Sequence, residues 1–357
     1  MNEDLYHNSI QLLKHLIAVP SFSKEEDRTA EIIMDFFSTQ GVHAERLANN
    51  IYAKNRHYDS NKPTILLNSH HDTVRPAKGY TNDPFCAIEQ DGKLFGLGSN
   101  DAGGSLVALI ATFLFFYDRS DLKYNIILAA SAEEEISGSN GIELLLPALG
   151  NIDCAIVGEP TEMKMAIAER GLLVVDCTAE GKAGHVAGTE GENALYKAIA
   201  DIDWIKNYRF DKVSPLLGET KMNVTVIETD NRQHNVVPSQ CKFVIDIRAN
   251  ELYDFDEVLQ LLQQNLKSGI QPRSTRLKPT SIALEHPLVK AGLGLDMEYY
   301  GSPTISDKAL MPFPALKLGP GKSARSHMAD EFIFLKEIEE GIEKYIRLIE
   351  TAENMSK

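Results

Sequence analysis

Histidines and carboxylates follow four short apolar runs of this sequence, at the points where buried strands would end. The clusters are His70-His71-Asp72 after residues 64–67, Glu133-Glu134-Glu135 after 125–130, Glu159 after 154–157, and His327 after 315–318. Ligands of open α/β sheets bind at the carboxyl ends of the strands, so we expect these side chains to meet at one edge. Mixed imidazole and carboxylate ligands suit zinc and its borderline neighbours, and the pattern therefore predicts a metal site.

The first cluster has an internal order that supports this interpretation. Successive side chains of a strand alternate between faces, so His70 and Asp72 share a side and His71 points away. A metal-bound imidazole usually donates its other N–H to a carboxylate, and Asp72 stands where it can accept that bond. The alternatives are a strand-end histidine that caps a turn and, for residues 133–135, a solvated acidic turn. Four such clusters together favour the metal site.

A glycine-rich segment, residues 92–105, precedes the most apolar stretch of the chain. Glycines before a helix suggest a phosphate-binding loop, but the segment lacks the Lys-Ser/Thr pair of a nucleotide loop and the spacing of a dinucleotide loop. Asp101, in its middle, would repel a phosphate. The segment is better interpreted as a tight backbone course that directs Asp101 toward a metal.

Composition excludes several classes of function. The 357 residues carry a formal net charge of −15, which disfavours both nucleic acid and anionic membrane surfaces as partners. Four cysteines without a CxxC pair exclude a disulfide scaffold and a thiolate zinc finger. The first residues are acidic and no signal-like apolar region follows, while the longest apolar stretch, 106–117, is too short to span a bilayer. We therefore predict a cytoplasmic protein.

The elements that must position these residues divide into two groups. Helical patterns at 4–18 and 25–40, with the four short apolar runs, predict an α/β domain with a buried sheet. The middle third instead shows alternating strands with two helices, which predicts a smaller α+β domain inserted into the larger one. The expected ranges are 1–172 and 284–357 for the discontinuous catalytic domain and 173–283 for the inserted domain.

Taken together, the motifs resemble one known family. They are residues 70–74 (HHDTV), 96–101 (GLGSND), 133–135 (EEE), 158–161 (GEPT) and 326–331 (SHMADE). The chain resembles, almost end to end, the co-catalytic zinc aminoacylases and exopeptidases that include acetylornithine deacetylase and succinyl-diaminopimelate desuccinylase. The resemblance implies a mixed-sheet, zinc-exopeptidase-like catalytic domain. It also implies an inserted ferredoxin-like domain that acts as a lid and as the interface of a homodimer, and a cis peptide bond between Asp101 and Ala102.

The resemblance further implies two divalent metal ions per subunit, Zn²⁺ with Co²⁺ as the alternative. One metal would be bound by His70 and Glu159 and the other by Glu135 and His327, with Asp101 bridging both. Glu134 corresponds to the general base and acid, and Asp72 to the residue that orients His70.

The remaining implied site residues lie in or near the inserted domain. His185 corresponds to an oxyanion-stabilising histidine, acting in its own subunit or across a dimer. Asn235 and Arg248 match positions that hold the substrate carboxylate, although an arginine at a strand end also commonly forms a structural ion pair. The loop from Gly301 to Asp307 resembles one that contacts the substrate backbone.

These features predict a di-metal amide hydrolase acting on linear amides. A divalent metal lowers the pKa of bound water to about 7, and Glu134 would take the water's proton and pass it to the leaving amine. The expected substrate is an N-acyl amino acid, with N-acetylornithine of arginine biosynthesis first and acylcitrulline or succinylornithine as variants. The alternatives are succinyl-diaminopimelate desuccinylase, a di- or tripeptidase and, more remotely, a catalytically silent binding protein.

Overall fold

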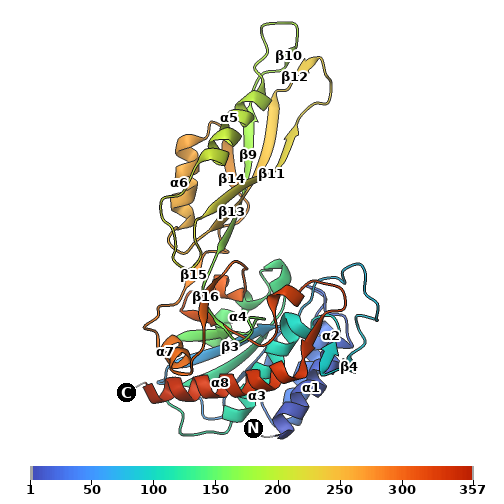
Figure 1. Cartoon of the computed structure of the whole chain (residues 1–357), viewed down its shortest axis with the longest axis vertical. Helices are drawn as coiled ribbons and strands as arrows, with labels where there is room; N and C mark the ends of the chain where they lie inside the picture. The colour runs from blue at the N-terminus through green and yellow to red at the C-terminus, as the bar shows by residue number, and fades with distance from the viewer. Residues whose placement is uncertain (1–2, 356–357) are drawn as a thin grey trace. The chain divides into compact units, whose positions relative to one another are not determined.

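The computed structural model describes residues 3–355, which fold into two units (Figure 1). The first unit comprises the chain up to Ile167, Ile282–Tyr300 and the chain from Ser306 onward. The second comprises Ala168–Ser281 and Gly301–Ile305. It therefore begins somewhat earlier than the expected range of 173–283. It also takes in a short later segment, residues 301–305, where the carbonyl of Ser302 accepts the N–H of Arg170 at 3.3 Å.

The first unit is built on a mixed sheet. Along the sheet the strands follow the order β1 (Ala44–Leu47), β2 (Asn50–Lys54), β6 (Asn125–Ser131), β3 (Thr64–His70), β7 (Cys154–Val157), β17 (Ala315–Lys317) and β8 (Met165–Glu169). Strand β3 runs parallel to both β6 and β7, and β17 runs parallel to β7. The four predicted strands are thus neighbours, and their carboxyl ends lie at the same edge. Strand β3 is longer than the apolar run 64–67, so His70 is its last residue rather than part of the following loop.

Helices cover this sheet. They are α1 (Glu3–Ile17), α2 (Asp27–Thr39), α3 (Gly104–Phe116), α4 (Ile142–Leu149), α7 (Pro287–Gly294) and α8 (Leu335–Met355). Helix α3 packs against α1, α8 and the central strands and is buried along almost its whole length. Within residues 3–355, the one helical stretch long and apolar enough for a membrane span is Ser99–Phe116, and 78% of it is buried inside the protein. It is thereby explained as a core helix.

Short elements complete the first unit. They are the strands β4 (Ile88–Gln90), β5 (Lys93–Phe95) and β18 (Phe332–Phe334), the π-helical turn η1 (Ser99–Gly103), and the 3₁₀ turns η2 (Glu134–Ile136), η3 (Asp307–Leu310) and η4 (Ser323–Arg325). Strand β5 pairs with both β4 and β18. This ribbon joins the segment before η1 to the segment before α8.

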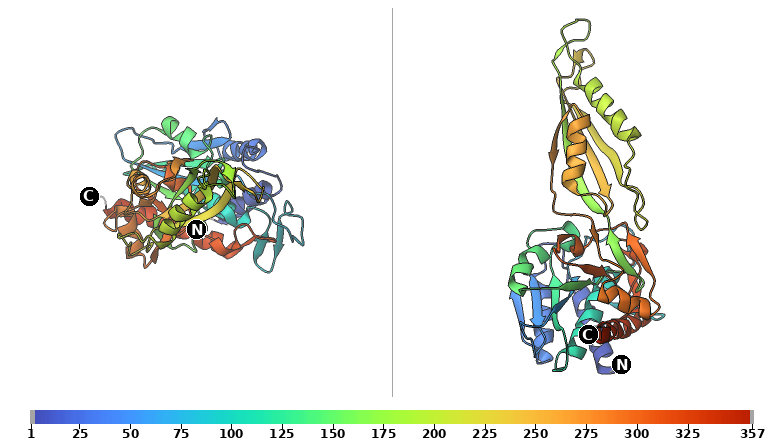
Figure 2. Two further views of the ribbon diagram at one scale, coloured as in Figure 1. Left: turned by 90° about the horizontal axis from the view of Figure 1, so that it is seen from above. Right: turned by 90° about the vertical axis from the view of Figure 1, so that its left-hand side faces the viewer.

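The second unit is an α+β fold. Its main sheet has the order β11 (Lys221–Thr229), β13 (Gln240–Ala249), β9 (Gly171–Glu180) and β14 (Gly269–Pro272). Helices α5 (Ala194–Asn207) and α6 (Phe255–Asn265) lie on one face of it, as Figure 2 shows. The inward residues of β9 and β13 alternate with outward ones and share one core with both helices, as the alternating pattern predicted.

Four strands of two to four residues remain. Strands β10 (Gly184–His185) and β12 (Val236–Val237) form a separate ribbon beyond the end of the main sheet. Strand β15 (Thr280–Ser281) pairs with the last residues of β8, and β16 (Tyr299–Ser302) also pairs with β8. The mixed α/β fold with an inserted α+β unit confirms the predicted fold class.

Candidate metal centre

The ends of the parallel strands bring the predicted ligands together. His70 is the last residue of β3, η2 follows β6 and carries Glu134 and Glu135, and Glu159 lies two residues beyond β7. His327 follows β17 at a greater distance, after the turn η4. Because β6, β3, β7 and β17 are adjacent and parallel, these short connections all open at one edge of the sheet.

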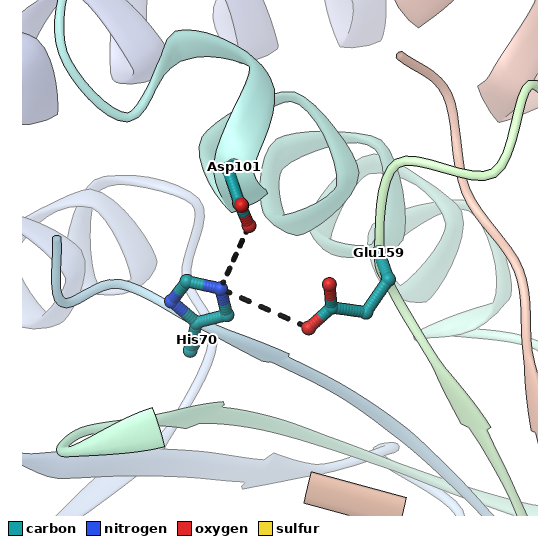
Figure 3. Close-up of side chains that lie close together, drawn as sticks. All are labelled: His70, Asp101 and Glu159. Atoms are coloured by element: carbon teal, nitrogen blue, oxygen red, sulfur yellow. Dashed lines mark hydrogen bonds and ion pairs between the residues drawn. The ribbon is translucent and has the colours of Figure 1, made fainter. Parts of the chain in front are cut away.

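The first group of ligands is His70, Asp101 and Glu159 (Figure 3). The Nε2 atom of His70 lies 3.3 Å from Oδ1 of Asp101 and 3.8 Å from Oε1 of Glu159. One ligand atom from each residue lies within 4.8 Å of the other two. This is the spacing of side chains that share a single cation.

The second group is Asp101, Glu135 and His327, which satisfies the same criterion. The Nε2 atom of His327 lies 3.0 Å from Oε2 of Glu135 and 3.6 Å from Oδ2 of Asp101. Asp101 belongs to both groups and presents a different carboxylate oxygen to each histidine. The structure therefore brings together all five predicted ligands around one aspartate.

The backbone around Asp101 is irregular, in agreement with the tight course predicted for this segment. Gly98 has a φ of +75°, where a side chain is disfavoured, and its added Cβ would lie 2.6 Å from Thr73. The peptide bond between Asp101 and Ala102 is cis, which confirms that prediction. Helix α3 begins at Gly104, three residues after Asp101, so Asp101 lies shortly before the most buried helix of the first unit.

Asp72 holds two parts of the site in place. Its backbone carbonyl lies 2.9 Å from Nδ1 of His70, and its carboxylate Oδ1 lies 3.4 Å from the same nitrogen. A carbonyl can only accept, so Nδ1 carries the proton and Nε2 is left to face the ligand groups. The carboxylate of Asp72 also accepts the backbone N–H groups of Glu134 and Glu135, at 3.0 and 3.2 Å. It thus orients the turn that carries the predicted base as well as the histidine.

Glu134 lies beside the first group without belonging to either. Its Oε2 is 3.9 Å from Nε2 of His70. Burial raises the pKa of Glu134 well above its ordinary value, and the charges of Glu159, Asp307 and Glu135 raise it further, while His70 opposes them. A carboxyl group with a raised pKa, near metal ligands but not among them, suits a general base and acid.

The two ligand histidines respond to the same excess of carboxylates. Burial opposes protonation of His70, but Glu134, Asp101 and Asp72 outweigh it and raise the pKa of His70 well above its ordinary value. The bond to Glu135 raises the pKa of His327 to about 9, even though its side chain is 52% exposed. A dication beside these groups would stabilise the carboxylates and displace the protons from the imidazoles.

The residues fit divalent metals. Five carboxylates gather at the site with two histidines, and buried or partly buried anions of this density require compensating positive charge. Two dications would nearly balance them. The five carboxylates are Asp72, Asp101, Glu134, Glu135 and Glu159. The donors are imidazole nitrogens and carboxylate oxygens, the set that suits zinc.

The predicted residues of the second unit do not all lie together. His185, exposed in β10, pairs with Val236, and the neighbouring Val186 N–H donates to the carbonyl of Asn235 at 3.1 Å. These two residues are therefore close. Arg248 lies near the other end of β13, eight residues beyond Gln240, about 26 Å along an extended strand. Strand β12 ends at Val237, three residues before β13 begins at Gln240, so the β10–β12 ribbon lies at the end of β13 opposite to Arg248. In Figure 1 this ribbon lies beyond the end of the main sheet.

Arg248 and Gly301 have structural partners. The guanidinium of Arg248 forms a bidentate ion pair with Asp246, at 2.8 and 3.0 Å. The structural ion pair, which was the alternative role expected for this arginine, is therefore present. A Cβ added to Gly301 would lie 2.5 Å from the carbonyl oxygen of Leu216, which explains a glycine there by close packing. Their roles toward substrate stay predictions.

Sequence reasoning missed three buried acids near the site. Glu331 accepts backbone N–H groups of the segment that carries Asp101, and Glu26 accepts the N–H of Glu133 at 3.1 Å. Asp307, assigned only to a loop, accepts the hydroxyl of Ser131 at 2.6 Å, and burial raises its pKa to about 6. Glu331 lies inside a recognised motif, four residues after His327, which is the one signal that could have identified it. Glu26 has no comparable signal in the sequence.

Comparisons with known proteins agree with this geometry. A family model described as peptidase family M20/M25/M40 matches residues 66–351. Succinyl-diaminopimelate desuccinylase of Rickettsia bellii is 29% identical over 280 residues, which cover 72% of this chain and 71% of that protein. Aminopeptidase PepT of Bacillus cereus has a TM-score of 0.78 at 17% identity, with 97% of this chain and 98% of that chain covered. The YXEP protein of Bacillus subtilis, a dinuclear metal-binding M20 peptidase, has a TM-score of 0.75 at 14% identity, with 98% of each chain covered. The similarity to these two solved structures, at 17% and 14% identity, shows a shared fold.

Proposed function

Because this chain belongs to peptidase family M20/M25/M40 and is therefore a metal-dependent hydrolase, we propose that it removes the acyl group from an N-acyl amino acid by means of two metals. The observation that carries the proposal is the pair of ligand groups that share Asp101, with Glu134, whose side chain is only 13% exposed, beside them. A carboxyl group that is close to the ligands but not among them is what hydrolysis of an unactivated amide needs.

Each residue has a defined task in this reaction. His70, Glu159, Glu135 and His327 would hold two divalent metals with Asp101 between them, and the metals, when bound, polarise the amide carbonyl and acidify water. Glu134 accepts a proton from the attacking water on its carboxylate. It then returns the proton to the nitrogen of the leaving amine, since an amide anion is too basic to leave. Asp72 fixes the orientation of His70 and of the turn that carries Glu134 throughout the reaction.

The acyl group that we propose is succinyl, with N-succinyl-diaminopimelate as the first substrate to test. The support is the name of the Rickettsia bellii relative, which is 29% identical over most of both chains. N-acetylornithine, favoured by the sequence motifs, stays a prediction, as do acylcitrulline and succinylornithine. A cytoplasmic location likewise stays a prediction.

We further propose that the working form is a homodimer joined through the second unit. Strand β11 forms one edge of the main sheet, and its Val226 and Ile227 are exposed. Helix α5 exposes Tyr196 and Ile199, spaced so that they share a helix face. An edge strand beside exposed apolar side chains favours pairing with another chain. Within one chain Asn235 and Arg248 are far apart, so they could bind one substrate carboxylate together only if two chains contributed them.

The test combines metal analysis with a substrate panel. The purified protein is stripped of metal with a chelator, reloaded with Zn²⁺ or Co²⁺, and assayed for amine release. The panel contains N-succinyl-diaminopimelate, N-acetylornithine, N-succinylornithine, N-acetylcitrulline and dipeptides. We expect two metals per chain, metal-dependent hydrolysis, and a kcat/KM for the preferred acyl amino acid at least about 100-fold above that for dipeptides. Preferred cleavage of dipeptides would assign an exopeptidase instead, and metal binding without any hydrolysis would assign a binding protein.

A further inference from the structure

Glu331 is a buried carboxylate that the proposed reaction does not use. We propose that it is a positioning residue that fixes Asp101 and His327 relative to each other, so that both metals depend on it. The inference rests on the proposed two-metal function, because it concerns the placement of the shared ligand.

The carboxylate of Glu331 accepts three backbone N–H groups from the segment that ends at Asp101. Its Oε1 lies 2.8 Å from the nitrogen of Asn100 and 2.9 Å from that of Asp101, and its Oε2 lies 3.1 Å from the nitrogen of Gly98. Its backbone carbonyl accepts a fourth, from Gly96 at 3.0 Å. Glu331 is 1% exposed, so water does not compete for these bonds.

Asn100 adds a second connection between the same two segments. Its Oδ1 accepts the N–H of Lys322 at 2.9 Å, and its Nδ2 donates to the carbonyl of Lys322 at 3.1 Å and to the hydroxyl of Ser326 at 3.3 Å. Ser326 directly precedes His327. The segment that carries one ligand is thus attached on both sides of His327 to the segment that carries the shared ligand.

A carboxylate is specifically suited to this place. The three donors belong to Gly98, Asn100 and Asp101, at the start of η1, where backbone N–H groups lack partners within the turn. A carboxylate accepts with both oxygens, whereas a glutamine would turn an NH₂ group toward one of the donors. The substitution of Glu331 by Gln therefore changes the course of the backbone at Asp101 while it preserves the size of the side chain.

The experiment measures Zn²⁺ affinity of the full-length, chelator-stripped protein by competition with a chromogenic chelator. We expect Glu331→Gln to lower Zn²⁺ affinity about 10- to 100-fold, the range seen when residues that orient metal ligands are changed. Glu331→Asp, which keeps the charge but is too short to reach all three donors, should also lower affinity, by about 10-fold. The aspartate variant decides the matter if the glutamine variant does not fold.

The matched control is Glu353→Gln. Glu353 is another buried glutamate of the first unit, and its Oε1 accepts the N–H of Lys123 at 2.9 Å, far along α8 from the ligands. The Glu353→Gln substitution should lower thermal stability without changing Zn²⁺ affinity. If Glu331→Gln and Glu331→Asp fold and bind Zn²⁺ as tightly as the unaltered protein, the positioning role is wrong and the two-metal function stands. If the unaltered protein binds no Zn²⁺, the proposed function itself is wrong.

Discussion

Asp101 and Glu134 divide the chemistry of the site between them at the scale of single residues. Asp101 offers one oxygen to each ligand group, so it must stay ionised and fixed. Glu134 must exchange a proton, and burial among carboxylates raises its pKa. Two acidic side chains in one site thus receive different tasks from their surroundings.

The role of Glu134 predicts the behaviour of Glu134→Gln. The amide cannot accept a proton, so we expect kcat to fall by a factor of about 100 to 10,000. Folding and metal content should be unchanged, because Glu134 belongs to neither ligand group. Amine release measures turnover, and elemental analysis of the same sample measures metal content. Near-normal turnover with full metal content would rule out this residue as the base.

Arg248 can be tested against its own ion-pair partner. If Arg248 binds the substrate carboxylate, Arg248→Ala should lower kcat/KM about 10- to 100-fold, mainly through KM, since a hydrogen bond to a charged group is lost. Asp246→Asn breaks the same ion pair, which is partly exposed and worth about 1 kcal/mol or less, and should leave KM unchanged. Equal, small effects of both variants would leave Arg248 with a structural role only.

At the scale of elements, α3 connects the core to the site, because Asp101 lies three residues before its first residue, Gly104. Phe113 of this helix is fully buried and lies edge-to-face with Phe37, 6.1 Å between ring centroids. Phe113→Ala should lower the free energy of unfolding by about 3–5 kcal/mol. Phe115→Ala, in the same helix but 38% exposed, should cost about 1 kcal/mol or less. Urea denaturation of both variants checks this, and equal losses would mean that α3 is not packed as described.

Helix α7 supplies a pH-dependent contribution to stability. Its N-cap is His286, whose Nδ1 accepts the N–H of Leu288 at 3.3 Å, and burial lowers the pKa of His286 below its ordinary value of 6.5. The unfolded chain therefore takes up the proton first as pH falls, so this contribution is complete above about pH 6.5 and is lost at lower pH.

His286→Asn tests that contribution, because asparagine caps a helix without titrating. Urea denaturation of both metal-stripped proteins between about pH 7 and pH 5 should show the unaltered protein losing stability relative to the variant as pH falls. If the stability difference between the unaltered protein and His286→Asn does not change with pH, then His286 has the same pKa in the folded and unfolded states.

For the whole molecule, the strongest prediction concerns assembly. We expect a homodimer by light scattering after gel filtration, and Ile227→Lys should give a folded monomer, because a lysine on an edge strand opposes edge pairing. Leu293→Lys, at a comparably exposed apolar residue of the first unit, is the control and should leave the dimer intact. Monomeric unaltered protein, or a dimer that tolerates Ile227→Lys, would contradict the predicted interface.

The sequence alone was sufficient to predict the features that depend on patterns among neighbouring residues. Short apolar runs identified β3, β6, β7 and β17, and a period of two identified β9 and β13, because burial on one or both faces imposes these patterns on neighbouring residues. The polar residues that follow the strands could then be assigned to one sheet edge. Motif resemblance added the roles predicted for Asp101 and Glu134 and the cis bond after Asp101, and the structure confirms the cis bond.

Only the tertiary structure decided which distant residues hold these ligands in place and which predicted residues lie apart. Glu331 reaches Asp101 across 230 positions of sequence, through a ribbon of β5 and β18 whose pairing no local period reveals. Asn235 and Arg248 belong to neighbouring stretches of sequence, yet an extended strand of about 26 Å separates their surroundings. Local patterns record which face of an element is buried, whereas contacts between elements depend on the path of every connection between them.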